Sequence, residues 1–153
     1  MARLELHVDI DGPPGLVGAY FLPHRMTYWY GRDMNCQFEV ERGADEYRAG
    51  QKVRISGRVA GREVSLVVVV TAYQRSSVLE WRFRDSYGVS GRQSWEIEPR
   101  AEGSRVRLRD EYELPGRIGR LWDSLVTRHA VRARDRRDLD RLKRLVEHRP
   151  IVA

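Results

Sequence analysis

Two residues of the sequence combine chemical reactivity with positions that face a predicted core. Asp110 lies on the apolar phase of an alternating segment, and His129 lies on the apolar face of the helical segment that follows. A buried ionised carboxylate is costly without a partner, so Asp110 must be paired, have a raised pKa or lie in a wet site. Histidine titrates near neutral pH and can shuttle a proton. The two residues are therefore candidate catalytic groups for general acid–base chemistry.

Each of these residues also has a structural alternative. Asp110 can accept hydrogen bonds from backbone amides or pair with an arginine, and His129 can be a half-buried helix residue that a neighbour satisfies. A one-residue slip at a β-bulge would move Asp110 to the other face of its strand. Both interpretations stay open at the level of the sequence.

Other residues on the inward phase predict the wall of a small-molecule cavity, which is typically apolar with a few placed polar groups. Gln93 and Tyr112 supply such polar groups. The cluster "MTYWYG" at 26–31 is either a gate to the cavity or a hydrophobic plug that closes the short helices against the sheet. The predicted ligand-binding residues are Trp81, Phe83, Gln93, Trp95, Tyr112, Ile118, Trp122, Leu125, Tyr28 and Trp29.

Motifs for metal, phosphate or nucleophilic chemistry do not stand out. The four histidines and the single Cys36 show neither H-x3-H nor C-x2-C spacing, and no Gly-rich phosphate loop precedes a lysine. Cys36 lies on an apolar strand face, which indicates a core thiol rather than a nucleophile. We therefore expect no metal and no cofactor.

Alternating apolar residues predict seven β-strands. The first is "RLELHVDI" (3–10), after which "DGPPG" and two short helices lead to Gly31. The period of two then continues through "CQFEVE", "KVRISGRV", "EVSLVVVVTAY", "VLEWRFR", "VSGRQSWEIE" and "SRVRLRDEYEL", with turn residues between them. This pattern is typical of an antiparallel meander. Because "EVSLVVVVTAY" is apolar on both faces, we expect it to be a central strand that is covered on both sides.

Pro115-Gly116 ends the last strand, and apolar residues then recur at helical spacing as far as His148. A helix over 117–148 would be about 48 Å long, which exceeds the width of a small domain (roughly 30 Å). We therefore expect the basic tail, residues 134–153, to bend or overhang. The order of strand, two short helices, six strands and long helix predicts an α+β fold in a single domain spanning 1–153.

This order resembles the START-like or Bet v 1-like (SRPBCC) superfamily and, within it, the bacterial polyketide cyclase/dehydrase and lipid-transport group. "VDIDGPP" with an apolar helix and Trp29 is similar to the family's opening, and "YRAGQKVRI" to its third strand. "YELPGRIGRLWDSL" with "LDRLKRLVE" is similar to its last strand and closing helix. The resemblance covers the whole chain. It implies a helix-grip fold, in which a curved seven-stranded antiparallel sheet wraps around the C-terminal helix with an apolar cavity between them.

Family members bind lipids, polyketides, hormones or other hydrophobic molecules, and some are enzymes, so the fold alone does not settle the function. The first hypothesis is a carrier or sensor that binds a hydrophobic small molecule such as a lipid or polyketide. The second is a cyclase, dehydratase or aromatase in which Asp110 and His129 move protons inside the cavity. The third is a partner-binding module that acts through the basic C-terminal helix.

The net charge of +6 is concentrated in that helix, since residues 128–149 hold nine Lys/Arg against four Asp/Glu. This segment can be a solvated face with local ion pairs, a docking site for an anionic membrane or acidic partner, or a phosphate-contacting surface. Outward arginines of the sheet alternate with glutamates, so we do not expect nucleic acid as the partner. The start "MARLELHVDI" has no signal-peptide pattern, and the single cysteine fits a cytoplasmic setting.

Overall fold

The computed structural model describes residues 2–39, 45–59, 61–116 and 128–148. The first half contains β1 (Ala2–Ile10), α1 (Pro14–Gly18), the 3-10 turn η1 (Ala19–Phe21), α2 (Pro23–Met26), a second 3-10 turn η2 (Arg32–Met34), β2 (Gln37–Glu39) and β3 (Lys52–Val59). The second half contains β4 (Arg62–Gln74), β5 (Val78–Asp85), β6 (Ser90–Arg100), β7 (Gly103–Glu113) and α4 (Arg128–Glu147). The predicted order of elements is confirmed.

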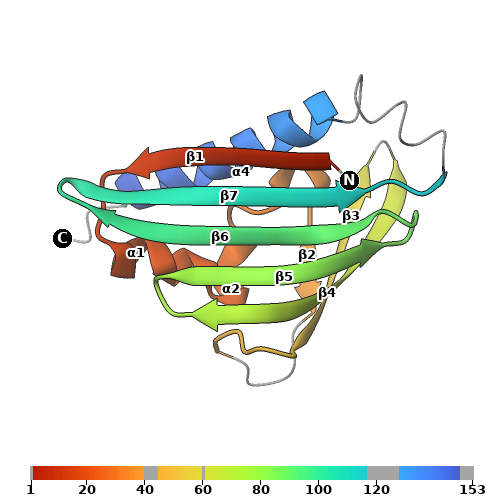
Figure 1. Cartoon of the computed structure of the whole chain (residues 1–153), viewed down its shortest axis with the longest axis horizontal. Helices are drawn as coiled ribbons and strands as arrows, with labels where there is room; N and C mark the ends of the chain where they lie inside the picture. Colours follow the sequence, from red (N-terminus) through yellow and green to blue (C-terminus); the bar gives the residue numbers. More distant parts are fainter. Residues whose placement is uncertain (1, 40–44, 60, 117–127, 149–153) are drawn as a thin grey trace.

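All seven strands form one antiparallel sheet in the order β1-β7-β6-β5-β4-β3-β2. The sheet is a meander in which β1 returns to pair with β7, from Ala2 opposite Tyr112 to Ile10 opposite Ser104. The β4–β5 register shifts between Val70 and Ala72, and a bulge of this kind increases the local twist. In Figure 1, β2, β3 and β4 curve away from the plane of the other strands, and α4 runs beside β1 at the opposite edge. The predicted helix-grip architecture is therefore confirmed.

Among the described residues, the strands with one apolar face bury the face that was predicted, but β4 is not covered on both sides as expected. Val68 and Val70 are fully buried, whereas Val67 on the other face is 41% exposed. The outer face of the sheet carries no second layer among the described residues, so the apolar run of β4 reflects strand propensity more than burial on two sides. The expectation of a strand covered on both sides is wrong.

Aromatic side chains fill the concave side of the sheet where α1, η1 and α2 pack against it. Trp29, Trp81 and Trp95 are each at most 1% exposed. Their rings meet edge to face, with centroids 4.9 Å apart for Trp81 and Trp95 and 6.2 Å apart for Trp29 and Trp95. Edge-to-face contacts of this kind are favourable beyond the buried area. The grip is therefore packed solid at this end.

The cations of α4 hold the helix along the free edge of β1. Arg128 donates to the carbonyl of Arg3, Arg136 to that of His7 at 3.0 Å, and Lys143 to that of Asp9 at 2.7 Å. An edge strand exposes unpaired backbone groups, and a charged helix is one way to cover them. The described part of the helix follows the sheet edge to Glu147, which accepts the amide of Asp11. Helical structure is continuous across 134–138, and residues 149–153 of the expected overhang lie outside the described residues.

A pair of neighbouring substitutions tests which face of β4 is buried. We expect Val68→Ala to lower the free energy of unfolding by about 2 kcal/mol, because two methyl groups leave the core. Val67→Ala should cost less than about 0.5 kcal/mol, because its side chain is largely solvated. Urea unfolding of both variants measures these losses in stability. Equal losses would contradict a sheet that is buried on one face only.

Candidate functional site

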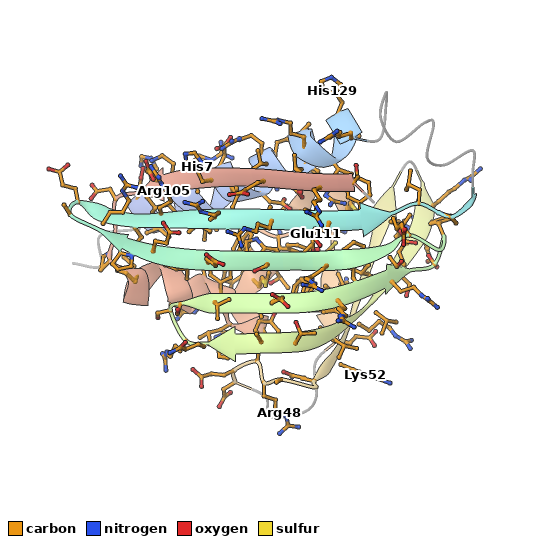
Figure 2. All side chains as sticks on the ribbon, in the orientation of Figure 1. His7, Arg48, Lys52, Arg105, Glu111 and His129 are labelled. Carbon is orange, nitrogen blue, oxygen red and sulfur yellow. The ribbon has the colours of Figure 1, made fainter. Side chains whose placement is uncertain are left out.

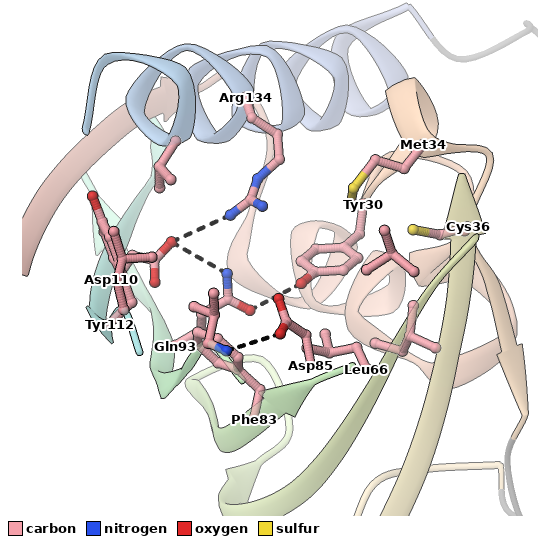
Figure 3. A pocket seen from close by; sticks show the side chains of 16 residues that line it. Tyr30, Met34, Cys36, Leu66, Phe83, Asp85, Gln93, Asp110, Tyr112 and Arg134 are labelled. Atoms are coloured by element: carbon pink, nitrogen blue, oxygen red, sulfur yellow. Dashed lines mark hydrogen bonds and ion pairs between the residues drawn. The ribbon is translucent and has the colours of Figure 1, made fainter. Parts of the chain in front are cut away.

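A cavity of about 230 Å³ lies between the sheet, the turn at η2 and helix α4, as bounded by the described residues. Its wall is mainly apolar, with Leu66, Phe83 and Val131 among the lining residues. Figure 3 shows Leu66 and Phe83 beside this space. Polar side chains gather where β6 and β7 face α4, namely Gln93, Asp110 and Arg134. Asp85, which also lines the cavity, accepts the amides of Tyr87 and Val89 at 2.8 and 2.9 Å and so closes the β5–β6 turn.

Gln93 is held in one orientation by two donors. Its Oε1 accepts hydrogen bonds from the hydroxyl of Tyr30 and from Nε1 of Trp81, both at 2.9 Å. The amide must then point its nitrogen the other way, and Nε2 donates to Oδ2 of Asp110 at 3.3 Å. Figure 3 shows this chain of contacts from Tyr30 to Asp110. Side chains from a loop, β5, β6 and β7 are thereby joined into one network.

Arg134 connects two buried carboxyl groups. Its Nη2 lies 3.6 Å from Oδ2 of Asp110 and 3.3 Å from Oδ1 of Asp135. Both aspartates are at most 2% exposed, while 31% of the Arg134 side chain stays exposed. Oδ1 of Asp110 and Oδ2 of Asp135 have no hydrogen-bond partner as long as both groups count as acceptors.

A shared proton resolves these two unpaired oxygens. Burial, and then the adjacent Asp135 carboxylate, raise the pKa of Asp110 well above its usual value, and burial raises the pKa of Asp135 as well. Repulsion between two adjacent buried carboxylates favours a single negative charge shared by the two groups, so they titrate as a coupled pair. Oδ2 of Asp110 faces the Gln93 and Arg134 donors, so a proton on this carboxyl would sit on Oδ1, the oxygen that has no donor of its own.

Asp138, one helical turn beyond Asp135 on α4, fixes the loop that forms part of the cavity wall. Asp138 accepts the amide of Gly31 at 3.3 Å and pairs with Arg141 at 3.2 Å. Gly31 has a φ of +65°, a left-handed conformation that suits glycine. Arg137 and Arg141 in turn bind Asp33, and these hydrogen bonds lower the pKa of Asp33. Burial raises the pKa of Asp138 to about 6.

The structure separates the two predicted catalytic residues. Asp110 is buried and lines the cavity, as expected from its phase. His129 is exposed near the start of α4, and Figure 2 shows it pointing away from the sheet. The expectation that the two side chains share one pocket is wrong, because the face of α4 that meets the sheet carries Asp135, Leu139, Leu142 and Val146 instead.

The predicted ligand-binding residues divide into four groups. Phe83, Gln93 and Tyr112 line the cavity. Trp81, Trp95 and Trp29 belong to the aromatic core, although Trp81 also orients Gln93, and Trp29 donates to the carbonyl of Tyr20 at 2.8 Å. Tyr28 is 55% exposed and lies outside the cavity wall, so its prediction as a lining residue is wrong. Ile118, Trp122 and Leu125 lie outside the described residues.

The cluster "MTYWYG" acts mainly as a plug. Met26 and Trp29 are fully buried in the core, and Tyr30 both packs there and lines the cavity. Cys36 also reaches the cavity wall, and burial raises the pKa of its thiol to about 11, so the sulfur stays protonated.

Sequence reasoning missed the charged residues of α4 that complete the site. "RARDRRD" interrupts the apolar pattern of the helix, and it contains Arg134, Asp135 and Asp138. The available signal was a pair of aspartates at i and i+3, which share a helix face, inside a basic run. Among the described residues, no group of three His, Cys, Asp or Glu is arranged to hold a metal ion. No helix of the described chain is long and apolar enough to span a membrane.

Fold and cavity together define a helix-grip protein with a partly polar internal site. The sequence matches the family model described as "Polyketide cyclase / dehydrase and lipid transport" over residues 1–147. The chain belongs to this family. Its family and fold indicate binding of a hydrophobic ligand.

Solved structures share this fold at low sequence identity. Protein CV1439 from Chromobacterium violaceum superposes with a TM-score of 0.72 at 16% identity and covers 96% of this chain and 99% of its own. A protein from Arthrobacter aurescens gives a TM-score of 0.74 at 14% identity, covering 97% and 87%. DynU16, from the dynemicin biosynthetic locus, gives 0.69 at 19% identity, covering 94% of this chain and 46% of that one. The search of curated protein sequences gave no match.

The raised pKa of Asp138 predicts a distinctive pH dependence of stability. Between the usual value of 3.8 and about 6, the folded state holds a proton that the unfolded state releases, so stability falls as pH rises through this window. Asp138→Asn removes this dependence. The difference between the free energies of unfolding of the Asp138→Asn variant and the native chain should therefore shift in favour of the variant by up to roughly 3 kcal/mol from pH 4 to pH 7.

Urea unfolding at several pH values measures this difference. Asp140→Asn is the matched control, because Asp140 is exposed on the same helix. Parallel pH curves for the Asp138 variant and the native chain would show that Asp138 ionises in the folded state as it does in the unfolded state.

Proposed function

We propose that the chain binds a compact hydrophobic molecule carrying one polar group, and that it acts as a carrier or sensor for that molecule. The observation that supports this most is the composition of the cavity wall, which is mainly apolar and carries a cluster of polar groups at Gln93, Asp110 and Arg134. Binding sites for small molecules have this composition, with apolar walls for affinity and a few polar groups for orientation.

The size of the cavity limits which ligands can fit. Ligand pockets commonly measure about 300–1,000 Å³, and the space bounded by the described residues is about 230 Å³. The aromatic core occupies the other end of the grip, where a longer molecule would have to lie. A fused ring system or a short branched chain therefore fits this space better than a long acyl chain.

A blocking substitution tests where the ligand binds. Val131 on α4 lines the cavity, whereas its neighbour Arg132 is exposed. We expect Val131→Trp to weaken the binding of 2-acetonaphthone at least about tenfold, since the indole fills the space, and Arg132→Trp to leave binding unchanged. Isothermal titration calorimetry of both variants gives the answer, with circular dichroism to confirm folding. Equal affinities would place the ligand elsewhere.

A second candidate function is acid–base catalysis, which the buried position of Asp110 at the cavity wall favours. In the dehydration of a β-hydroxy ketone, Oδ2 of Asp110 would take the α-proton while the proton shared by the pair moves onto Asp135. Asp110 would then deliver the proton it has taken to the departing hydroxyl, so that a C=C bond forms, water leaves and the pair regains its shared proton. Asp135 would act as a positioning residue, because it reaches the cavity only through Asp110.

The dehydration of 4-hydroxy-4-(2-naphthyl)butan-2-one, followed by the absorbance of the enone, tests this second function. We expect Asp110→Asn to lower turnover by roughly 10²–10⁴-fold while the affinity for 2-acetonaphthone changes little. Asp140→Asn should keep full turnover. The native chain failing to exceed the Asp110 variant would leave binding as the only function of the cavity.

A further inference from the structure

The charges at the polar end of the cavity cancel. Arg134 supplies one positive charge, and Asp110 with Asp135 supplies one negative charge because the pair keeps a single proton. The next groups along α4 also balance, since Arg137 and Arg141 bind the carboxylates of Asp33 and Asp138. The cluster of Arg134, Asp110 and Asp135 is thus polar but carries no net charge.

Arg134 still has donors to offer to a ligand. Its Nε and Nη2 contact the two aspartates, and Nη1 has no partner among the described residues. A guanidinium carries five N–H groups, two of them on Nη1. Figure 3 shows the guanidinium reaching from α4 into the space that the apolar wall encloses. Gln93, in contrast, has its oxygen filled by two donors, and one of the two N–H groups of its amide already donates to Asp110.

We propose that this polar end binds the neutral carbonyl oxygen of a compact hydrophobic ketone or aldehyde through Arg134, and that it admits a carboxylate only when the aspartate pair takes up a second proton. The inference rests on the proposed function and adds the chemical class of the ligand. A carbonyl oxygen accepts a charge-assisted hydrogen bond without altering the balance of charge. A carboxylate would add one buried negative charge, which is costly unless a proton compensates it.

Groups on every element around the aspartate pair define the conditions for a test. Arg134, Asp138 and Arg141 belong to α4, Gln93 to β6, Asp85 to the end of β5, and Tyr30, Asp33 and Cys36 to the segment between α2 and β2. Burial raises the pKa of the Tyr30 hydroxyl and of the Cys36 thiol, so both stay neutral. Asp138, with a pKa of about 6, is ionised in weakly alkaline buffer and does not contribute protons there.

Three ligands of matched shape separate the contributions of a neutral carbonyl, a carboxylate charge and the apolar ring. They are 2-acetonaphthone, 2-naphthoate and 2-methylnaphthalene. At about pH 8 we expect the ketone to bind at least tenfold more tightly than the carboxylate, and several-fold more tightly than the hydrocarbon. The affinity for the carboxylate should rise by up to tenfold for each unit of falling pH, as one linked proton requires. Calorimetry in buffers of different ionisation enthalpy should detect uptake of one proton with the carboxylate and none with the ketone.

The double variant Asp110→Asn/Asp135→Asn reverses the preference. It leaves Arg134 uncompensated, so the carboxylate should then bind more tightly than the ketone, without proton uptake. Asp140→Asn should keep the native preference. If the double variant fails to fold, the proton counts for the native chain still decide the matter.

Two results would overturn the proposal. One is tighter binding of the carboxylate by the native chain at about pH 8 with no proton uptake. The other is equal affinity for the ketone and the hydrocarbon, which would leave the proposed function standing but remove the role of Arg134. If none of the three ligands binds, the proposed function fails, and the inference fails with it.

Discussion

The ion pairs of Arg134 with Asp110 and Asp135 are the constraint on which the rest of the site depends. Buried charges must be neutralised, and here one guanidinium faces two carboxyl groups that can hold only one negative charge between them. Burying one of these charges without a partner would cost several kcal/mol. Gln93, Tyr30 and Trp81 are ordered around this arrangement, so the helix, three parts of the sheet and the loop are fixed relative to one another by one polar network.

Neutralisation within the molecule also explains the positive charge of α4. Its positive charge looks like a docking surface when only the composition is considered, but Arg136 and Lys143 bind backbone carbonyls of β1, and Arg137 and Arg141 bind Asp33. These contacts cover the edge of the sheet and hold the cavity wall. A charge reversal at Arg136, Arg137 or Arg141 would therefore disturb the fold as well as any external partner. Most of the charge that the helix carries is used within the molecule.

The cavity is the part of the grip that the aromatic core leaves unfilled. Trp29, Trp81 and Trp95 pack the end near α1 and α2, while residues with smaller side chains, such as Gly57 and Val64, line the open end. The backbone carbonyl of Met34 approaches Gly57 so closely that an added Cβ would lie 2.8 Å from it. Side-chain volume therefore determines the position and size of the ligand space within a fold that many sequences share.

By itself the sequence determined the strands, their inward faces and the order of elements, because alternation and turn residues are local signals that burial on one face enforces. It also placed Asp110, Gln93, Phe83 and Tyr112 on the inner face correctly. It did not determine that His129 is exposed, because a helical wheel gives a face but not its rotation against a sheet that lies far away in sequence. The tertiary structure alone decided that rotation. It brought Arg134 and Asp135 to Asp110, and the cost of burying unpaired charge explains why these residues meet.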